Sequence, residues 1–351
     1  MPQPISIFEL KNRLSKLIEE RIWDIPVFVK GPPGIGKSSA IKQVAEEHEL
    51  ELSSLRISQL DPQGLRGLPT TDEDEGVSRW LPPAELPRGE GPGLLFLDEY
   101  VTAPPAIMKI AQRLTFERKT GAEYSLPSKC LVVAAGNRLD DPRAQVNPLP
   151  APTANRMIHF KVEADLPSFR RYAIQNALDP DILGFLNFRP ELLYNLEPAK
   201  GGEHAFPSPR SWKHASRLLK ADLPIAHAVG EAAAAEFQAY TEVEGTIPGL
   251  DAILEGHGND TKELPDEPSA QYSVAAGLAG RAESGLECFN AAGWLVRESE
   301  ASDELLQLLF SMLTAKLEDR PEAREVFIEN AMADEELCSF MSRATALGLE
   351  L

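Results

Sequence analysis

Nine consecutive residues have the types and the spacing needed to hold a phosphate group. They follow the pattern Gly-x4-Gly-Lys-Ser, in which backbone N–H groups close around a phosphate. In this pattern the lysine reaches the outer phosphate oxygens, and the hydroxyl of the next residue can bind Mg²⁺. The segment predicts a nucleoside triphosphate as ligand, bound by Gly31, Pro32, Pro33, Gly34, Ile35, Gly36, Lys37, Ser38 and Ser39.

Two acidic residues, Asp98 and Glu99, follow the apolar run 94–97. Carboxylates at the end of a buried strand suit two tasks in triphosphate hydrolysis. Asp98 can hold Mg²⁺ together with Ser38, while Glu99 can polarise the attacking water. An isolated Asp-Glu pair is as often a solvated strand end, so the catalytic interpretation depends on the preceding phosphate loop. Together they predict Mg²⁺-dependent hydrolysis.

A third polar residue, Asn137, follows the apolar run 131–135 and Gly136. A neutral amide at this place can hydrogen-bond the attacking water or a γ-phosphate oxygen without neutralising Glu99. Asparagine after a strand is also a common turn former. The order of the three motifs along the chain favours the role of a phosphate sensor for Asn137.

The elements that carry these residues alternate along the chain. Apolar, β-rich runs at 25–29, 52–57, 93–97 and 130–135 alternate with helical patterns at 39–47 and 105–118, and an amphipathic helix is predicted over 5–22. This alternation predicts a parallel sheet with helices on both faces. The segment 61–92 is rich in proline, glycine and acids, and we expect it to be an insertion with a hairpin around 77–81.

Strand signals fade beyond residue 164, and helical patterns replace them. They cover 166–178, 179–196, 211–219 and 225–240, followed by a Gly/Asp/Pro-rich stretch at 246–268 that is typical of a linker. A last helical set covers 270–282, 285–298, 302–317 and 321–346. The predicted fold class is therefore α/β, with a parallel-sheet core followed by a helical lid and a further helical extension.

Composition and charge narrow the class of protein. A chain of 351 residues, 43% of them apolar, can bury a sizeable core in two or three domains. Its three cysteines and six histidines lack metal-ligand spacing, so no metal beyond Mg²⁺ is expected. Neither an eighteen-residue apolar stretch nor a leader pattern occurs, which predicts a soluble, cytoplasmic protein. Of the net charge of −19, −14 lies within 251–351, which argues against nucleic acid as the main substrate.

The order of the three motifs resembles that of AAA+ ATPases. The motifs are Gly-Pro-Pro-Gly-Ile-Gly-Lys-Ser-Ser, then Leu-Phe-Leu-Asp-Glu, then Ala-Ala-Gly-Asn-Arg. Within AAA+ proteins the chain looks most like the MoxR group, which includes the CbbQ-type activators. This closer match rests on Ser58–Pro62 with Leu65–Pro69, on Gln112–Pro127 and on Ala154–Ile158. The resemblance covers residues 1–245 well and is weak beyond them.

The resemblance implies a division of the chain. Residues 1–163 correspond to the AAA+ core, which would contain a loop-and-hairpin insertion at 61–92 and a second hairpin at 116–127. Residues 164–245 correspond to the helical lid. A linker at 246–268 and an acidic helical extension at 269–351 would follow.

The resemblance also implies roles for two arginines. Arg156 stands where the family places an arginine finger, which reaches the γ-phosphate bound by the neighbouring subunit, and this implies a homo-oligomeric ring, usually of six. Arg210 matches the second sensor at the start of a lid helix. Each arginine could instead form a surface ion pair. The sequence departs from the family at Asn155, where many relatives carry aspartate, and Trp80 could be either a pore-loop residue or a buried anchor.

The function implied by the resemblance is that of an ATP-hydrolysing ring motor that remodels or activates a client protein. MoxR-like ATPases typically work with a separate protein that carries a von Willebrand factor A domain. Two alternatives stay open: a motor acting on nucleic acid, and a nucleotide-dependent assembly scaffold. A nucleic-acid motor would need basic pore loops. The insertion instead carries three arginines, Arg66, Arg79 and Arg88, against Asp72, Glu73, Asp74, Glu75, Glu85 and Glu90.

Overall fold

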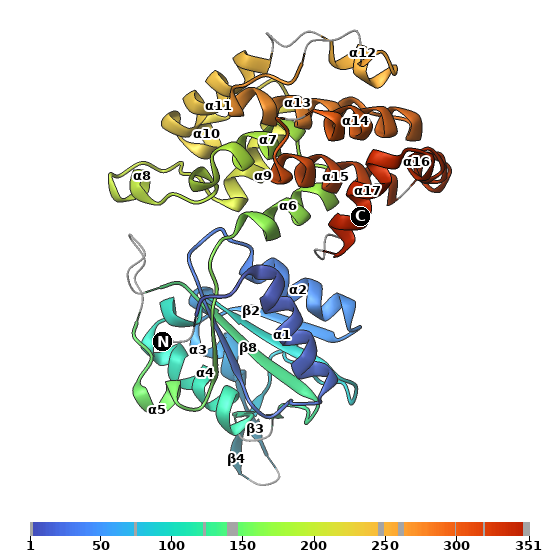
Figure 1. Ribbon diagram of the computed structural model, residues 1–351. Helices are drawn as coiled ribbons and strands as arrows, with labels where there is room; N and C mark the ends of the chain where they lie inside the picture. Colours follow the sequence, from blue (N-terminus) through green and yellow to red (C-terminus); the bar gives the residue numbers. More distant parts are fainter. Residues whose placement is uncertain are drawn as a thin grey trace. The chain divides into compact units, whose positions relative to one another are not determined.

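The computed structural model describes residues 3–73, 76–121, 124–138, 147–244, 249–258, 263–298, 300–318 and 320–346. The chain forms two compact units, Met1–Asp165 and Leu166–Leu351 (Figure 1). Parts of the predicted segments lie outside the described residues, namely 74–75 and 122–123 of the two hairpins, 246–248 and 259–262 of the linker, and 299, 319 and 347–351 of the extension.

The first unit is built on a five-stranded parallel sheet with the order β2-β5-β8-β1-β9. All of β8 and nearly all of β5 are buried, as expected for central strands with helices on both faces. This confirms the predicted α/β fold class. The strands are β1 (Val27–Lys30), β2 (Glu51–Arg56), β5 (Gly93–Asp98), β8 (Cys130–Gly136) and β9 (Ile158–Lys161), and the main helices are α1 (Ile7–Glu19), α2 (Lys37–Glu47) and α4 (Pro105–Glu117).

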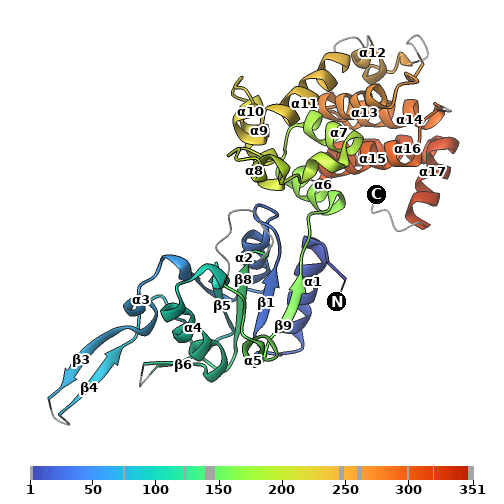
Figure 2. The ribbon, with the colours of Figure 1, turned by 90° about the vertical axis from the view of Figure 1, so that its left-hand side faces the viewer.

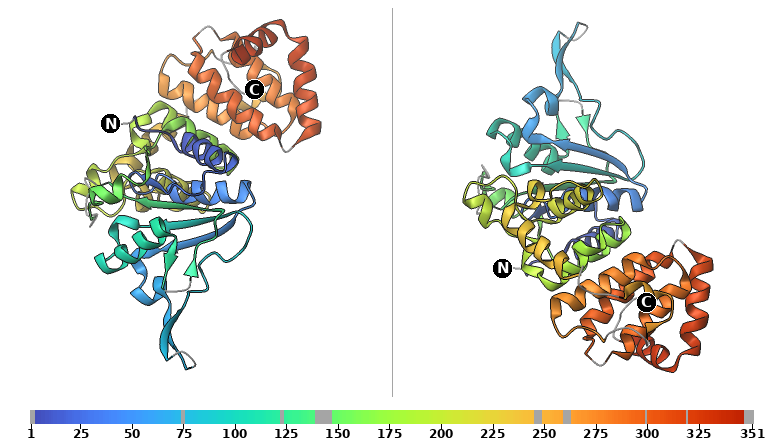
Figure 3. Two further views of the ribbon diagram at one scale, coloured as in Figure 1. Left: turned by 90° about the horizontal axis from the view of Figure 1, so that it is seen from below. Right: turned by 90° about the horizontal axis from the view of Figure 1, so that it is seen from above.

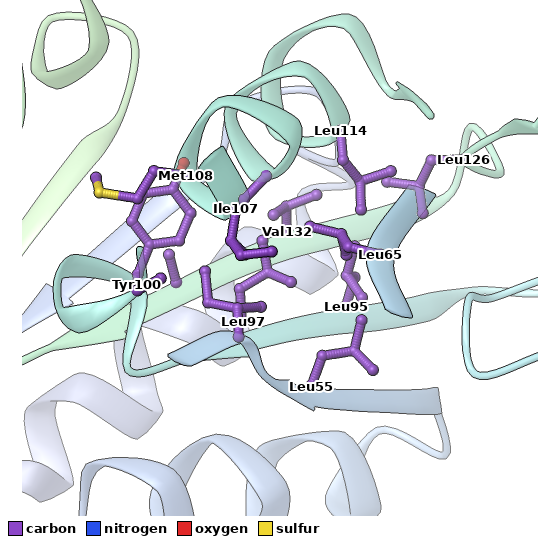
Figure 4. Packing of buried hydrophobic residues seen from close by; sticks show 14 of the residues in the cluster. Leu55, Leu65, Leu95, Leu97, Tyr100, Ile107, Met108, Leu114, Leu126 and Val132 are labelled. Atoms are coloured by element: carbon purple, nitrogen blue, oxygen red, sulfur yellow. The ribbon is translucent and has the colours of Figure 1, made fainter. Parts of the chain in front are cut away.

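The apolar core of this unit includes a cluster between α4 and the sheet (Figure 4). Leu95, Leu97 and Val132 face it, because alternate side chains of a strand point to the same side. Ile107 and Leu114 of α4 pack onto them. Their burial holds β5 and β8 side by side, so the polar residues that follow these two strands emerge at the same edge of the sheet.

One strand of the sheet, β9, was not predicted. It lies at an edge, where it pairs with β1 only. Its four residues, Ile-His-Phe-Lys, are half-buried or exposed. Such a short edge strand with two apolar side chains gives a weak signal in the sequence.

In each of the two segments where a hairpin was expected, the described residues contain an antiparallel pair of strands. The insertion at 61–92 forms α3 (Pro62–Arg66) and an antiparallel pair, β3 (Leu68–Asp72) and β4 (Val77–Leu81). Figures 2 and 3 show this pair extending away from the sheet. The second hairpin begins later than 116, because α4 continues to Glu117, and its strands are β6 (Lys119–Thr120) and β7 (Tyr124–Ser125).

The two inserted segments contact each other. The Thr120 hydroxyl donates to the carbonyl of Leu65 in α3 at 3.2 Å. The guanidinium of Arg66 lies 4.0 Å from the ring centroid of Trp80, and the Trp80 side chain is half-buried. These contacts favour the anchor role for Trp80 over that of a pore-loop residue.

The second unit is helical. In chain order the helices are α6 (Leu166–Gln175), α7 (Pro180–Phe188), α8 (Glu197–Lys200), α9 (Pro209–Leu219), α10 (Ala226–Val229), α11 (Glu231–Glu244), α12 (Leu250–Leu254), α13 (Pro268–Arg281), α14 (Gly285–Arg297), α15 (Asp303–Glu318), α16 (Pro321–Ala333) and α17 (Glu335–Ala346). The short helices α8 and α12 were not predicted, and α12 lies inside the stretch interpreted as a linker.

Three of the predicted helices are broken in two. The pattern at 179–196 is α7 followed by a 3₁₀ turn, because the residue before Pro190 avoids helical dihedrals. The pattern at 225–240 breaks at Gly230, whose φ is 88°. The pattern at 321–346 breaks at Asp334, which is extended.

Helix α13 joins the lid region and the extension by packing. It contacts α7 and α11 of the predicted lid and α15 of the predicted extension. Gly184 of α7 lies close to α13, since a Cβ there would lie 2.8 Å from the Cβ of Ala276. Residues 166–351 thus form one compact unit. The division of this unit into a lid, a linker and an extension remains a prediction. Across the described residues, we find no helix with the length and hydrophobicity that crossing a membrane requires.

Candidate active site

The glycine-rich loop connects the end of β1 to the first turn of α2. Gly34 and Gly36 have φ values of 80° and 102°, which side chains with a Cβ rarely adopt. Gly31 lies against the backbone of Val162, where a Cβ would come within 2.6 Å of the carbonyl oxygen. Helix α2 starts at Lys37, two residues earlier than predicted, and no side chain caps its N-terminus. The N-terminus of a helix carries N–H groups without an intrahelical partner, and such a helix end after a glycine-rich loop suits an anion.

Lys37 is buried in this loop, with 8% of its surface exposed. Its ammonium donates to the carbonyls of Gly31 at 2.7 Å and Pro32 at 2.8 Å, and to Oδ1 of Asn137 at 3.3 Å. Asn137 follows β8 and is half-buried. Since a phosphate oxygen is a stronger acceptor than a carbonyl, a triphosphate in the loop would compete for this ammonium.

The hydroxyl of Ser38 donates to Oδ2 of Asp98 at 2.8 Å. This contact joins the first turn of α2 to the end of β5. A serine hydroxyl and a carboxylate are hard oxygen ligands of the kind that Mg²⁺ prefers, and Mg²⁺ usually takes only one or two protein groups and completes its shell with water and phosphate oxygens. The donor set therefore fits Mg²⁺. Among the described residues, no group of three or more His, Cys, Asp or Glu could hold a metal ion.

Glu99 has a left-handed backbone with φ 57°, an uncommon conformation for a residue with a Cβ. Its N–H donates to Oδ1 of Asp98 at 2.9 Å. Its carboxylate accepts a hydrogen bond from the Ser58 hydroxyl and lies 3.5 Å from Nε of Arg56. One carboxylate oxygen is thus contacted by the last residue of β2, and the other by the 3₁₀ turn Ile57–Gln59 that follows this strand.

Arg56 and Ser58 were not identified as site residues from the sequence. Arg56 is the last residue of β2 and pairs in register with Asp98. The sequence contained a signal for these residues. Polar residues that directly follow parallel strands all lie where the carboxyl ends of those strands meet. The sequence did not show that β2 is the neighbour of β5.

Arg156 lies at the opposite end of the strands, where their amino ends are. Strand β9 runs parallel to β1, with Val27 paired to Ile158 and Lys30 to Lys161. The turn before β9 therefore lies where the strands begin, about 13 Å along the strand from the loop after β1. Arg156 is exposed, and its guanidinium lies 5.7 Å from the ring centroid of Phe116.

Arg210 belongs to the helical unit. It is exposed in the first turn of α9, between Ser208 and Ser211, which form a capping box. The structure therefore brings together Lys37, Ser38, Asp98, Glu99 and Asn137 at one edge of the sheet, with Arg156 at the opposite end of the strands and Arg210 in the other unit.

Comparisons with known proteins give similarities in structure only. No model of a protein family matches the chain, and no curated protein matches it. Solved structures that resemble it include NtrX from Brucella abortus, at 13% identity and a TM-score of 0.39, covering 63% of this chain and 52% of that chain. The match thus spans about half of the NtrX chain. NtrX has also been solved with ADP and with ATP.

Two further structures share more of their length with this chain. A point mutant of RuvB from Thermotoga maritima is 16% identical with a TM-score of 0.39, covering 80% of this chain and 86% of that chain. A protein from Cytophaga hutchinsonii, provisionally described as an ATPase, is 13% identical with a TM-score of 0.33, covering 91% of this chain and 88% of that chain. At such identities and TM-scores the similarities carry no argument about activity, and the fold assignment rests on the sheet itself.

Proposed function

We propose that this chain is an AAA+ ATPase that works as a homo-oligomeric ring, hydrolyses ATP with Mg²⁺ and remodels a client protein. The observation that carries the proposal is that four side chains meet at the glycine-rich loop, Lys37 with Asn137 and Ser38 with Asp98, and that Glu99 follows Asp98 directly. Lys37, Ser38 and Asn137 supply donors for phosphate oxygens, and Asp98 and Glu99 supply carboxylates beside them. These are the groups that phosphoryl transfer to water requires.

Each residue has a task that its surroundings support. Lys37 can exchange its two carbonyl acceptors for phosphate oxygens, and Asn137 can orient a γ-phosphate or water through its amide. Ser38 and Asp98 would hold Mg²⁺, which neutralises phosphate charge when bound. Glu99 would accept a hydrogen bond from the attacking water, in competition with the one from Ser58.

The place of Arg156 supports a ring. Because it lies at the end of the strands opposite the loop, it is not positioned to reach the phosphate of its own subunit. In a ring, this end of one subunit can face the loop of the next. An arginine supplied in this way stabilises charge in the transition state of phosphoryl transfer. Arg210 would act as the second sensor.

The surface of the insertion favours a protein client over nucleic acid. Its three arginines are engaged within the chain: Arg66 with the Trp80 ring, Arg79 with Asp72, and Arg88 with backbone carbonyls. The exposed side chains of the β3–β4 hairpin include three large apolar ones, Leu68, Val77 and Leu81. Such a surface suits contact with protein better than with a polyanion.

We further propose that the chain belongs to the MoxR group and works with a separate von Willebrand factor A-domain partner. This finer assignment depends on the motif resemblance in residues 1–245. Retention of such a partner by the Glu99→Gln variant in the presence of ATP and Mg²⁺ would support it. If DNA instead stimulates ATP hydrolysis by the wild-type protein, the nucleic-acid alternative would be favoured.

The test of the proposal is steady-state ATP hydrolysis together with molecular mass in solution, with and without ATP and Mg²⁺. We expect the wild type to assemble and turn over ATP many times. Glu99→Gln should lose at least about a hundredfold in kcat while still binding ATP. Normal turnover by Glu99→Gln, or a protein that stays monomeric at saturating ATP, would refute the proposal.

Arg156→Ala completes the test, with an expected loss of about a thousandfold in kcat and retained nucleotide binding. Arg13→Ala is the matched control. Arg13 belongs to α1, its side chain is also exposed, and its guanidinium lies 5.6 Å from the ring centroid of Phe160. We expect Arg13→Ala to hydrolyse ATP at the wild-type rate.

A further inference from the structure

Arg156 lies beside an aromatic ring. The guanidinium lies 5.7 Å from the centroid of Phe116, within the range of a cation–π contact. Phe116 belongs to the last turn of α4, forty residues earlier in the chain than Arg156. The contact therefore connects two segments that only the fold brings together.

The ring itself is fixed. Phe116 is half-buried and packs against the core cluster between α4 and the sheet. Met157, the residue after Arg156, is 7% exposed and belongs to the same cluster. The N–H of Arg156 also donates to the carbonyl of Thr153 at 3.2 Å. Both the backbone of Arg156 and the ring under its side chain are thus anchored in one core.

This contact leaves the arginine available to an anion. A cation–π contact gives the guanidinium N–H groups no hydrogen-bond acceptor, so they can still donate to an anion. Within the described part of the chain, no carboxylate forms an ion pair with Arg156. A surface ion pair was the alternative interpretation of this residue, and no carboxylate of the described residues supports it.

We propose that Phe116 is the positioning residue for the arginine that each subunit supplies to the phosphate site of its neighbour. The inference rests on the proposed function. An exposed arginine loses much of its rotamer freedom when it binds a phosphate. Phe116 restricts that freedom in advance, so that less is lost in the transition state. The ring acts through Arg156 and contacts no substrate.

The test uses mixed oligomers in which each variant lacks a different half of the shared site. Lys37→Ala subunits bind no nucleotide productively but supply Arg156, so they are the donors. Arg156→Ala subunits bind ATP but supply no arginine, so they are the acceptors. Each variant alone should be inactive, and their mixture should recover hydrolysis where a donor meets an acceptor.

Phe116→Leu is then introduced either into the donor subunits or into the acceptor subunits. In the donor we expect it to lower the recovered kcat by about two- to fivefold, the factor that corresponds to a cation–π contact at an exposed site. In the acceptor, which has no arginine to position, we expect the recovered kcat to stay unchanged. Phe116→Tyr in the donor keeps the ring and should restore the rate.

A matched control separates positioning from packing. Ile110 of α4 is also partly buried against the same core cluster, so Ile110→Ala in the donor removes a similar apolar contact. We expect it to leave the recovered kcat unchanged. Equal losses from Phe116→Leu in donor and acceptor, or no loss in the donor, would overturn the inference.

These outcomes differ from a failure of the proposed function. If the simple mixture of Lys37→Ala and Arg156→Ala subunits recovers no hydrolysis, the site is not shared between subunits, and both the ring mechanism and the role of Phe116 are wrong. If the mixture recovers hydrolysis but ignores Phe116, only the role of Phe116 is wrong.

Discussion

The contact between Ser58 and Glu99 makes a prediction about the resting rate of hydrolysis. Both oxygens of the Glu99 carboxylate are contacted by residues at or just after the end of β2, one by the Ser58 hydroxyl and one by Arg56 at 3.5 Å. In the proposed mechanism Glu99 polarises a water molecule, and each contact stabilises the carboxylate charge and makes it a weaker acceptor for that water. Part of the energy of the contact therefore adds to the activation barrier, and Ser58→Ala should raise kcat in the absence of a client.

The structure sets the size of this effect. A hydrogen bond to a charged group contributes about 1.5–3 kcal/mol when well shielded from water. The Glu99 side chain is 44% exposed, so water replaces much of the lost bond. We take about 1 kcal/mol as the net value, which corresponds to roughly a fivefold increase in kcat. The Arg56 ion pair, with both side chains about half exposed, should contribute less than about 1 kcal/mol.

The assay is phosphate release at saturating ATP and Mg²⁺, compared between wild type and Ser58→Ala. Ser54→Ala is the matched control, because Ser54 is an exposed serine on β2, four residues before Ser58, and it should leave kcat unchanged. The double variant Ser58→Ala, Glu99→Gln should be as inactive as Glu99→Gln alone. A lower kcat for Ser58→Ala with an unchanged KM would refute the reasoning, since Ser58 would then position Glu99 for the reaction.

Three further predictions concern binding, stability and reactivity. Lys37→Met should abolish the stabilisation of about 2.7 kcal/mol that ATP at roughly 100 times its Kd gives the wild type, as measured by thermal unfolding; an unchanged shift would contradict this. Trp212→Ala should destabilise the helical unit by about 3–5 kcal/mol in urea unfolding, because the Trp212 side chain is fully buried and packed against other aromatic rings, and a loss below about 1 kcal/mol would contradict it. At about pH 8 a thiol reagent should label the exposed Cys338 first. Burial raises the pKa of Cys130 to about 12 and also raises the pKa of Cys288, so both remain neutral thiols, and equally fast labelling of all three would contradict this.

The central strands of the sheet could be predicted from the sequence, and the edge strand β9 could not. The run 130–135 was predicted as a strand and is β8, because seven consecutive buried residues give a strong signal for a central parallel strand. The edge strand β9 was missed, because half of its side chains are polar. The helix breaks at Gly230 and Asp334 were also missed, since both residues occur within otherwise continuous helical patterns.

The phosphate loop itself was determined by local sequence. Positive φ angles at Gly34 and Gly36 and a helix starting at Lys37 depend on neighbouring residues, so contiguous letters were enough to identify it. The order of the strands is different, because it depends on pairing between segments far apart in the chain. Only that pairing placed Ser58 against Glu99 and Arg156 at the end of the strands opposite the loop. The sequence by itself therefore determined which residues form the glycine-rich loop and which polar residues follow the central strands, because both are local patterns. The tertiary structure decided which residues contact Glu99 and that Arg156 lies exposed at the opposite end of the strands.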